Sequence, residues 1–217
     1  MKRNGGTFAI MLALVSIFVG CASSGSSVSL SNDELLQRAS DYYVKNDYDR
    51  AIKDFTEVIQ RGAHLEVACF MRGSAYLYGK ADYDRAIIDF SKVIELDPNA
   101  VRAFFSRGET YLMKKNHDLA IADYTDAIRL DPTPDTYYQR GQAYREKKDL
   151  DNAIADYTEA INLDPNLTKA YFNRGVVHGN NGDLEEAIAD WEIVLRLDSN
   201  YPNVNRYMEI AKQQLGR

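Results

Sequence analysis

The stretch Asp149-Leu-Asp-Asn-Ala-Ile-Ala-Asp-Tyr157 recurs, with small changes, four more times along the 217-residue chain. The other copies are Asp47-Tyr-Asp-Arg-Ala-Ile-Lys-Asp-Phe55, Asp82-Tyr-Asp-Arg-Ala-Ile-Ile-Asp-Phe90, Asn116-His-Asp-Leu-Ala-Ile-Ala-Asp-Tyr124 and Asp183-Leu-Glu-Glu-Ala-Ile-Ala-Asp-Trp191. Their alanines, Ala51, Ala86, Ala120, Ala153 and Ala187, are spaced by 35, 34, 33 and 34 residues. Five copies in nearly fixed register predict a repeat architecture.

Each copy combines two stretches with apolar residues at helical spacing. The first has apolar or small residues at positions 4, 8 and 11 of the copy, and the second has apolar residues at positions 20, 21, 24, 27 and 28. Small residues at positions 8 and 20 let the two helices approach closely, and the ring at position 24 can fill the space between neighbouring pairs. Because no copy can bury its own apolar face alone, we expect the helix pairs to stack in a row.

This pattern resembles the tetratricopeptide repeat (TPR) family, which sets a small residue at position 8, aromatic residues at 11 and 24, Ala at 20 and Pro at 32. Position 8 holds Ala39, Gly73, Gly108, Gly141 and Gly175, position 11 holds Tyr42, Tyr76, Tyr111, Tyr144 and His178, and position 24 holds Phe55, Phe90, Tyr124, Tyr157 and Trp191. Asp-Pro closes three copies, at Pro98, Pro132 and Pro165. The resemblance covers residues 32–201 and implies an all-α, right-handed solenoid of five helix-turn-helix repeats.

The resemblance also implies the boundaries of the repeats. They are residues 32–65, 66–100, 101–133, 134–167 and 168–201, and the second copy carries one extra residue between its two helices, near Gly79. Residues 202–217 are expected to form a capping helix, because the last pair would otherwise expose its stacking face. Its apolar stripe comprises Val204, Tyr207, Met208, Ala211 and Leu215.

An arginine and an aspartate recur in all five copies. Position 7 holds Arg38, Arg72, Arg107, Arg140 and Arg174, and position 23 holds Asp54, Asp89, Asp123, Asp156 and Asp190. Five unpaired buried guanidinium groups would be very costly, so we expect each arginine to pair with one of these aspartates, within a copy or between copies. The alternative is a row of arginines offered to an anionic ligand, which the net negative charge disfavours.

The chain begins with a candidate export signal. Lys2 and Arg3 precede an apolar run of 14 residues, too short for the roughly 20 that a membrane-spanning helix needs, so residues 1–20 are predicted to be a signal peptide. The end of the run, Phe18-Val-Gly-Cys21-Ala22, resembles the lipobox of bacterial lipoproteins, which implies lipidation of Cys21. Ordinary cleavage after Ala22 would instead leave a soluble exported protein.

A short polar tether follows the leader. Residues 21–31 contain six serines and no charge, and ten such residues span roughly 17 Å r.m.s.. Ala22 after the cysteine resembles outer-membrane sorting in the lipoprotein family, so we expect a bacterial cell-envelope protein on the outer membrane, facing the periplasm. Cys69 lies in an apolar helical face, and with Cys21 acylated it has no disulfide partner.

Composition and motifs disfavour catalysis and nucleic-acid binding. The formal charge is −6, which gives nucleic acid no basic surface to bind. His64, His117 and His178 lie in different copies without ligand spacing, and the Asp-x-Asp pairs around Tyr48 and Tyr83 lack the Gly and Glu of a calcium loop. No phosphate-binding loop, Cys-x-x-Cys or nucleophile beside a histidine occurs. We expect no enzyme, no cofactor and no metal site.

In the TPR family, positions 2, 5, 9 and 12 line a concave groove. The residues that the resemblance assigns to it are Leu36, Phe70, Leu77, Arg102, Phe105, Leu112, Tyr138, Gln142, Arg145, Lys169 and Phe172. Its amino-terminal half is apolar and its carboxyl-terminal half mixes rings with polar side chains, which suits a peptide with an apolar anchor. Alternatively, the rings at position 5 only pad the scaffold. The Lys at 5 and Asn at 9 of TPR domains that clamp chaperone carboxyl termini are absent.

These observations predict a lipid-anchored, non-enzymatic adaptor that binds a protein or peptide in its groove. By resemblance, such proteins serve envelope assembly, secretion or pilus assembly, or the docking of cell-wall enzymes. The alternative is a TPR component of a periplasmic solute-transport system that binds a small apolar ligand or a substrate-binding protein. A ligand between Phe70 and Phe105 would favour that alternative.

Overall fold

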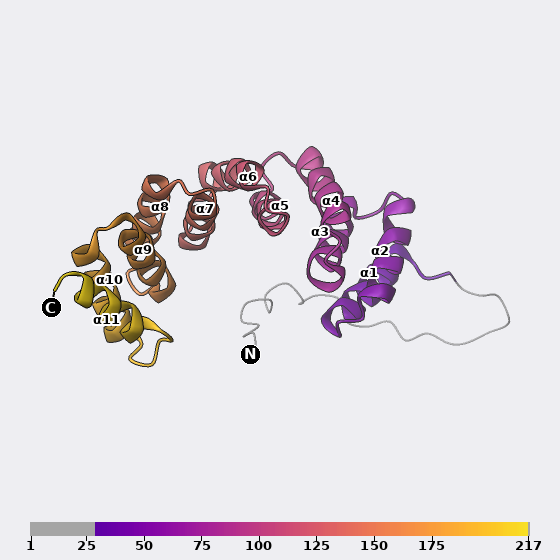
Figure 1. The fold of residues 1–217 in the computed structure, drawn as a ribbon. Coiled ribbons are helices and arrows are strands. Elements are labelled where there is room, and N and C mark those ends of the chain that lie inside the picture. Colours follow the sequence, from indigo (N-terminus) through magenta and orange to yellow (C-terminus); the bar gives the residue numbers. More distant parts are fainter. Residues whose placement is uncertain (1–28, 217) are drawn as a thin grey trace. The chain divides into compact units, whose positions relative to one another are not determined.

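The computed structural model describes residues 29–216, in which one compact unit begins at Ser31 (Figure 1). The predicted signal peptide (1–20), Cys21 and residues 22–28 of the predicted tether lie outside the described residues. Residues 29–216 form eleven α-helices and one π-helix, and contain no strand. This confirms the predicted all-α solenoid of paired helices. No helix in this range combines the length and apolar character needed to span a bilayer.

The helices follow one another in pairs. They are α1 (Asn32–Val44) and α2 (Tyr48–Gln60), α3 (Leu65–Ser74) with the π-helix η1 (Ala75–Lys80) and α4 (Tyr83–Leu96), α5 (Val101–Met113) and α6 (His117–Leu130), α7 (Pro134–Glu146) and α8 (Leu150–Leu163), α9 (Thr168–Asn181) and α10 (Leu184–Leu197), and then α11 (Val204–Gln214). Each second helix packs against the first helix of the next pair. Within this unit α1, α3, α5, α7 and α9 lie on the inner side of the row, which we call the inner face (Figure 1).

Large rings and glycines hold each pair together. The position-24 rings Phe55, Phe90, Tyr124, Tyr157 and Trp191 are almost completely buried. At Gly108, a Cβ atom would lie 3.0 Å from the Tyr124 ring, and at Gly175 it would lie 2.6 Å from the Trp191 indole nitrogen. Glycine at these positions therefore allows the ring of the second helix to lie directly on the backbone of the first.

Polar side chains define where the helices begin. Ser31 forms a capping box with Glu34 at the start of α1, so the folded unit begins at this residue. The second helix of four copies is capped by the side chain of Asp47, Asp82, Asn116 or Asp149, each of which accepts a hydrogen bond from the backbone N–H three residues further on.

The extra residue of the second copy lies inside a helix. The sequence pattern predicts it between the two helices near Gly79, but in the structure it lies in η1, where the backbone N–H of Asp82 donates to the carbonyl of Tyr76 six residues back. The equivalent bond in the first copy, from Asp47 to Tyr42, spans five residues. A one-residue insertion that widens a helical turn in this way is a π-bulge.

The last helix covers the end of the row. Val204, Met208 and Ala211 of α11 are buried, and α11 packs on α10. Tyr207 packs against the Trp191 ring with centroids 5.5 Å apart. This contact removes apolar surface of the fifth copy from water.

Candidate functional site

The rings at position 5 rest on the core rings of their own copies. Phe70 packs on Phe90 and Phe105 on Tyr124, each with ring centroids 5.6 Å apart. Phe70 and Phe105 nevertheless remain partly exposed. Padding of the scaffold and exposure to a partner are therefore compatible at these two positions, because one side of each ring is buried and part of its surface is not.

The second and third copies expose additional apolar side chains. Val67 of α3 is 51% exposed, Tyr78 of η1 is 53% exposed and Met113 of α5 is 50% exposed. Val67 is at position 2, while Tyr78 and Met113 lie one helical turn after position 9, so all three share the face of the groove positions. Sequence reasoning missed them, although their apolar character at this spacing was visible. Leu36 and Leu112, two of the residues predicted to line the groove, are partly buried.

Two residues expected to line the groove contribute little surface. Leu77 is only 5% exposed, because η1 changes the helical register and Leu77 joins the buried cluster of Tyr76 and Phe90. Tyr138 is only 8% exposed, because its ring packs on Tyr157 and lies under the Lys169 ammonium group, 4.4 Å from the ring centroid. Both side chains therefore stabilise the inner face and leave little surface for a partner to contact.

Polar groups of the fourth and fifth copies bond one another across the inner face. Arg145 Nη1 donates to Asn173 Oδ1 at 2.7 Å, and Arg145 Nη2 donates to Gln142 Oε1 at 3.4 Å. Asn173 Nδ2 in turn donates to the Tyr138 hydroxyl at 2.8 Å. These contacts join α7 to α9 through neutral amide groups.

The remaining predicted groove residues are engaged in cation and ring contacts. Lys169 Nζ lies 2.6 Å from Asp135 Oδ1. The Arg102 guanidinium lies 5.1 Å from the Phe70 ring centroid. Phe172 packs against Tyr201 and Tyr207, with centroids 5.1 Å and 5.7 Å away, so the residues after α10 partly cover it.

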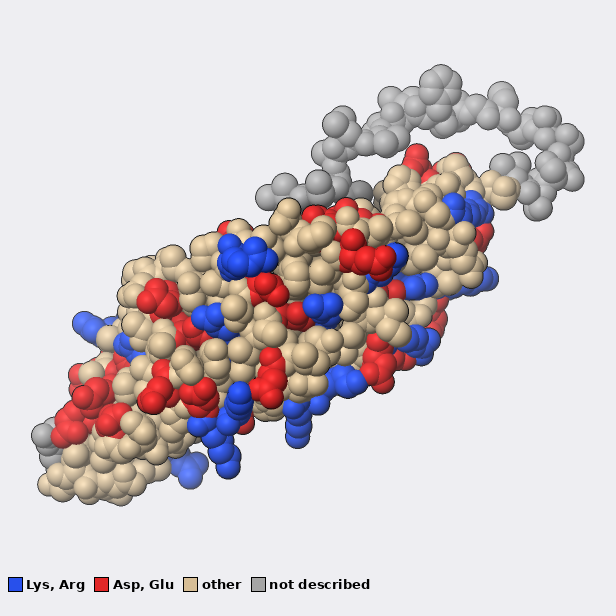
Figure 2. Space-filling model, turned by 90° about the horizontal axis from the view of Figure 1, so that it is seen from above, with Lys and Arg blue, Asp and Glu red and all other residues tan. Residues whose placement is uncertain are grey.

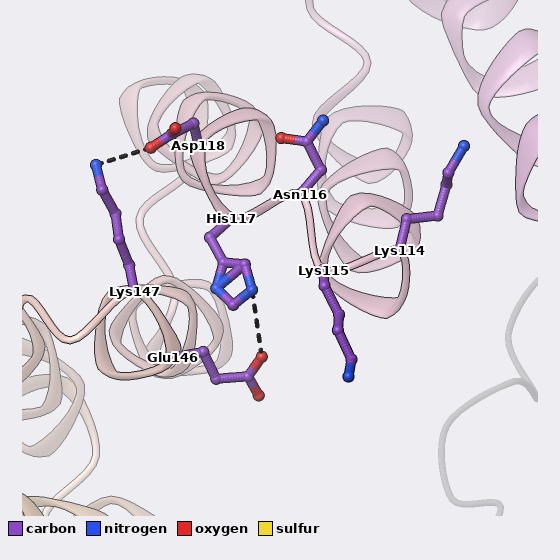
Figure 3. A pocket seen from close by; sticks show the side chains of 7 residues that line it. All are labelled: Lys114, Lys115, Asn116, His117, Asp118, Glu146 and Lys147. Atoms are coloured by element: carbon purple, nitrogen blue, oxygen red, sulfur yellow. Dashed lines mark ion pairs between the residues drawn. The ribbon is translucent and has the colours of Figure 1, made fainter.

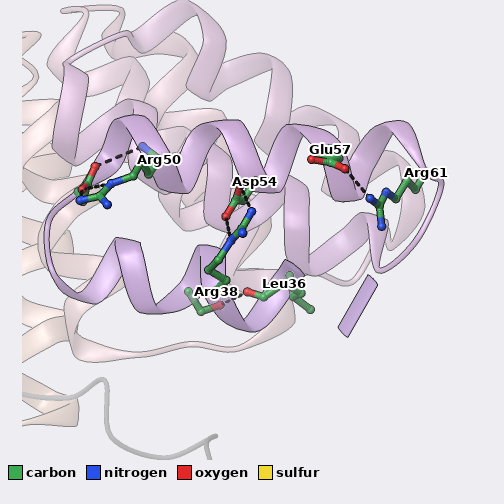
Figure 4. A network of polar contacts seen from close by, with 8 residues as sticks. Leu36, Arg38, Arg50, Asp54, Glu57 and Arg61 are labelled. Carbon is green, nitrogen blue, oxygen red and sulfur yellow. Dashed lines mark hydrogen bonds and ion pairs between the residues drawn. The ribbon is translucent and has the colours of Figure 1, made fainter. Parts of the chain in front are cut away.

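The five position-7 arginines lie against the position-23 aspartates of their own copies. Each makes two parallel bonds, and Figure 4 shows the first of them, in which Arg38 Nε lies 2.7 Å from Asp54 Oδ2 and Arg38 Nη2 lies 2.9 Å from Asp54 Oδ1. The other pairs are Arg72–Asp89, Arg107–Asp123, Arg140–Asp156 and Arg174–Asp190, with donor–acceptor distances of 2.7–2.9 Å. The carboxylate partner raises the pKa of each arginine, which keeps the guanidinium charged. The pairing leaves no arginine row open to an anion.

Each of the later four arginines also bonds a hydroxyl of the preceding copy. The donor is Nη1 and the bonds are Arg72 to Thr56, Arg107 to Ser91, Arg140 to Thr125 and Arg174 to Thr158, at 2.9–3.0 Å. Sequence reasoning missed these position-25 hydroxyls. Their signal was present, because a hydroxyl residue occurs in the four copies that another copy follows, whereas the fifth has Glu192.

The best-defined pocket of the described residues is open and lined by charged side chains. An open pocket of about 490 Å³ lies where α5, α6 and α7 end or begin (Figure 3). Lys147 Nζ there lies 2.7 Å from Asp118 Oδ1, and His117 Nε2 lies 3.9 Å from Glu146 Oε2. Within residues 29–216, no three His, Cys, Asp or Glu side chains gather as metal ligands would. Cys69 is a buried thiol whose pKa is raised by burial, which disfavours the reactive thiolate.

Charges on the opposite surface are mixed in sign. Figure 2 shows lysines and arginines interspersed with aspartates and glutamates over the face seen from above. A surface without a continuous basic stripe gives the nucleic-acid backbone little to bind.

Comparison with protein families and solved structures gives a consistent result. Family models described as tetratricopeptide repeat match residues 70–135 and 168–201, and a model described as TPR repeat matches residues 141–182. No curated protein matches the chain. MamA (residues 41 to the end) from Desulfovibrio magneticus RS-1 has a TM-score of 0.74 at 22% identity, covering 79% of this chain and 97% of that one.

Two further similar structures are those of peptide-binding or peptide-bound TPR proteins. YrrB, described as a TPR protein with an unusual peptide-binding site, has a TM-score of 0.70 at 18% identity, covering 84% of this chain and 92% of that one. The first TPR of Spaghetti (RPAP3), bound to the HSP90 peptide SRMEEVD, has a TM-score of 0.52 at 30% identity, covering 54% of this chain and 94% of that one. At identities of 18% and 22%, the likeness to YrrB and MamA concerns the fold alone.

Proposed function

Because the chain belongs to the tetratricopeptide repeat family, we propose that it is a non-enzymatic adaptor that binds a peptide segment of a partner protein on its inner face. TPR repeats form scaffolds for protein interaction, and two of the similar structures are described as peptide-binding or peptide-bound. The partner's segment lies across α3, α5 and α7, with its apolar side chains on the second and third copies.

One observation carries this proposal. Val67, Tyr78 and Met113 each expose about half of their surface on the face where Phe70 and Phe105 are also accessible. Exposed apolar side chains that gather on one face mark interaction sites, whereas single ones need no explanation. The helices beneath them are fixed by the core rings, so a partner meets a surface that needs little reorganisation.

We also propose that the protein is attached to a membrane. Lipid on Cys21 would hold the folded unit at a membrane, most simply the outer membrane facing the periplasm, and the serine-rich residues before Ser31 would act as the spacer. The roles open to such an adaptor are envelope assembly, secretion or pilus assembly, and docking of cell-wall enzymes. Cys21→Ser should move the protein from the membrane to the soluble fraction, and continued membrane association of that variant would refute lipidation at this site.

Photo-cross-linking in intact cells tests the binding face. A benzoylphenylalanine at Met113 or Val67 should yield a defined protein adduct, identified by mass spectrometry. The matched control is the same residue at Ile88, which is 65% exposed but lies on α4, outside the inner face. Absence of adducts at both inner positions, or the same adducts at position 88, would contradict the proposal.

A further inference from the structure

The turn between α9 and α10 contains an asparagine followed by a glycine, Asn181-Gly182. Within residues 29–216, no other asparagine precedes a glycine. The equivalent turns of the other copies contain Lys45-Asn46, Lys80-Ala81, Lys114-Lys115 and Lys147-Lys148. Asn181 and Gly182 are both exposed, and Gly182 ends α9 with a φ of +93°. The turn of the fifth copy therefore has a chemistry that the other four turns lack.

An asparagine in such a pair can react with its own backbone. The nitrogen of the following residue attacks the side-chain carbonyl carbon, a new C–N bond forms, and the amide nitrogen leaves as ammonia with the proton of the backbone N–H. Water then opens the resulting five-membered imide at either of its carbonyl groups, which gives aspartate or isoaspartate. A following glycine favours the attack because it has no side chain to obstruct it and because its backbone rotates easily.

The structure holds the two reacting groups of this pair in a loosely bound part of the backbone. Asn181 Nδ2 donates to Asp183 Oδ2 at 2.7 Å, so the side chain lies along the two residues that follow it. The Gly182 N–H donates to the Gly179 carbonyl at 3.4 Å, which is long for a backbone hydrogen bond. Because helix ends fray, opening of the last turn of α9 is enough to free this nitrogen for the attack.

Both products of the reaction disturb the turn. The bond from the Asn181 amide holds the pKa of Asp183 below its usual value. A carboxylate at residue 181 would instead repel Asp183, in a turn that already carries Glu185 and Glu186 at the start of α10. Isoaspartate would add one carbon atom to the backbone between the His178 carbonyl and the Asp183 N–H, which now form a hydrogen bond of 2.9 Å.

The packing of α10 on α9 lies close to this turn. Trp191 of α10, the one tryptophan of the chain, is 2% exposed, and its Nε1 donates to the Phe172 carbonyl at 3.4 Å. A Cβ atom at Gly179, in the last turn of α9, would lie 3.4 Å from the Trp191 ring. A turn that loosens at Asn181 therefore weakens the contact that buries this ring.

We propose that Asn181 is a site of spontaneous deamidation in the folded protein, and that its products loosen the last pair of helices. The reaction consumes only water and releases ammonia, so it proceeds without an enzyme or a cofactor. The inference is independent of the proposed function, because it concerns how long α9, α10 and α11 keep their packing and not what the inner face binds.

Peptide mapping of the aged protein tests the site. The purified full chain is incubated near neutral pH and digested with trypsin, which releases Asn181 in peptide 175–196 and Asn46 in peptide 46–50. Mass spectrometry should find that the side-chain amide of Asn181 becomes a carboxyl group, with a gain of one negative charge, in comparison with a sample digested before incubation. Asn46 is the matched control, because it is exposed in the equivalent turn of the first copy but precedes Asp47, and it should keep its amide.

Variants assign the reaction to this pair. Asn181→Gln has a longer side chain that disfavours the ring, so its peptide should stay unmodified, whereas Asn180→Gln should still deamidate at Asn181. Modification of Asn181→Gln as fast as the wild-type chain, or equal loss of the amide at Asn46, would overturn the proposal. It would also be overturned if the folded chain kept the Asn181 amide while the urea-unfolded chain lost it.

The structural consequence is measured on the deamidated chain, separated from the intact chain by anion exchange. Hydrogen exchange should accelerate in α10 and α11, and the Trp191 fluorescence should shift to longer wavelength, while the amides of α1 to α6 keep their protection. Asn181→Asp should reproduce the effect of the aspartate product without incubation. Unchanged exchange and fluorescence in both samples would refute the loosening of the last pair of helices.

Discussion

The arginine–aspartate pairs show how a single residue type can be required in every copy. Asp123 is 4% exposed and accepts two bonds from Arg107, so Asp123→Ala leaves a guanidinium without its counter-charge in a mostly buried position. We expect a loss of about 3–5 kcal/mol in the free energy of unfolding. Asp126→Ala removes only the pair with Arg129 on the surface of the same helix and should change stability by less than about 0.5 kcal/mol. Urea denaturation measures both, and equal losses would contradict a structural role for the pair.

Tyr124 illustrates the opposite case, a polar group that the core does not use. Its hydroxyl is buried without a hydrogen-bond partner among the described residues, and burial raises its pKa, so the group stays protonated. Phe55 and Phe90 fill the same position in the first two copies without a hydroxyl. Because an unpaired buried hydroxyl costs about 1–3 kcal/mol, Tyr124→Phe should leave the free energy of unfolding unchanged or raise it.

The control for this substitution is another tyrosine. Tyr138→Phe removes a hydroxyl that accepts a bond from Asn173, so it should lower stability by about 1 kcal/mol in the same urea titration. A loss at Tyr124→Phe as large as that at Tyr138→Phe would mean that the Tyr124 hydroxyl has a partner, such as a buried water.

Among the secondary-structure elements, the π-helix η1 depends most on one residue. A Cβ atom at Gly79 would lie 2.2 Å from the Tyr48 ring at the start of α2, so the glycine lets η1 pack against the first copy. Gly79→Ala should therefore destabilise the boundary between the first two copies by about 1–3 kcal/mol. The matched background is Tyr48→Ala, in which the ring is absent and Gly79→Ala should cost much less, as a double-mutant cycle of urea titrations would show. Additive losses would mean that the ring is not the obstacle.

The same element marks the limit of what could be predicted from the sequence. The helices, the core rings and the recurring Arg and Asp follow from periodicity, because each copy repeats the same local requirement. The extra residue near Gly79 was visible as well, yet a one-residue insertion fits a loop or a widened helical turn equally well in sequence. The choice depends on packing against Tyr48 of another copy, and with it the burial of Leu77. The bond from Arg145 to Asn173 was unpredictable for the same reason, since it joins two copies.

For the whole molecule, the row of copies is linked by the bonds from arginine to the hydroxyl of the preceding copy. No copy precedes that of Arg38 among the described residues, and the Arg38 side chain is 46% exposed, whereas those of the four later arginines are 17–19% exposed. Each of the four later arginines thus serves two purposes, since it pairs with the aspartate of its own copy and fixes the boundary with the preceding copy. Stability in such a row is roughly a sum of the copies and their boundaries, so a weakened boundary should act locally.

Thr158→Val tests this coupling, because it keeps the shape of the side chain but removes the hydroxyl that accepts from Arg174 Nη1 at 2.9 Å. We expect a loss of about 1–2 kcal/mol, since the lost bond has a charged donor. Hydrogen exchange should accelerate in α9, α10 and α11, beyond the weakened boundary, while the amides of α1 to α6 keep their protection. Thr168→Val is the matched control, because the Thr168 hydroxyl bonds only the nearby Asn166 carbonyl at 3.3 Å. Faster exchange along the whole row, or the same response to Thr168→Val, would show that the hydroxyl does not couple the fourth copy to the fifth.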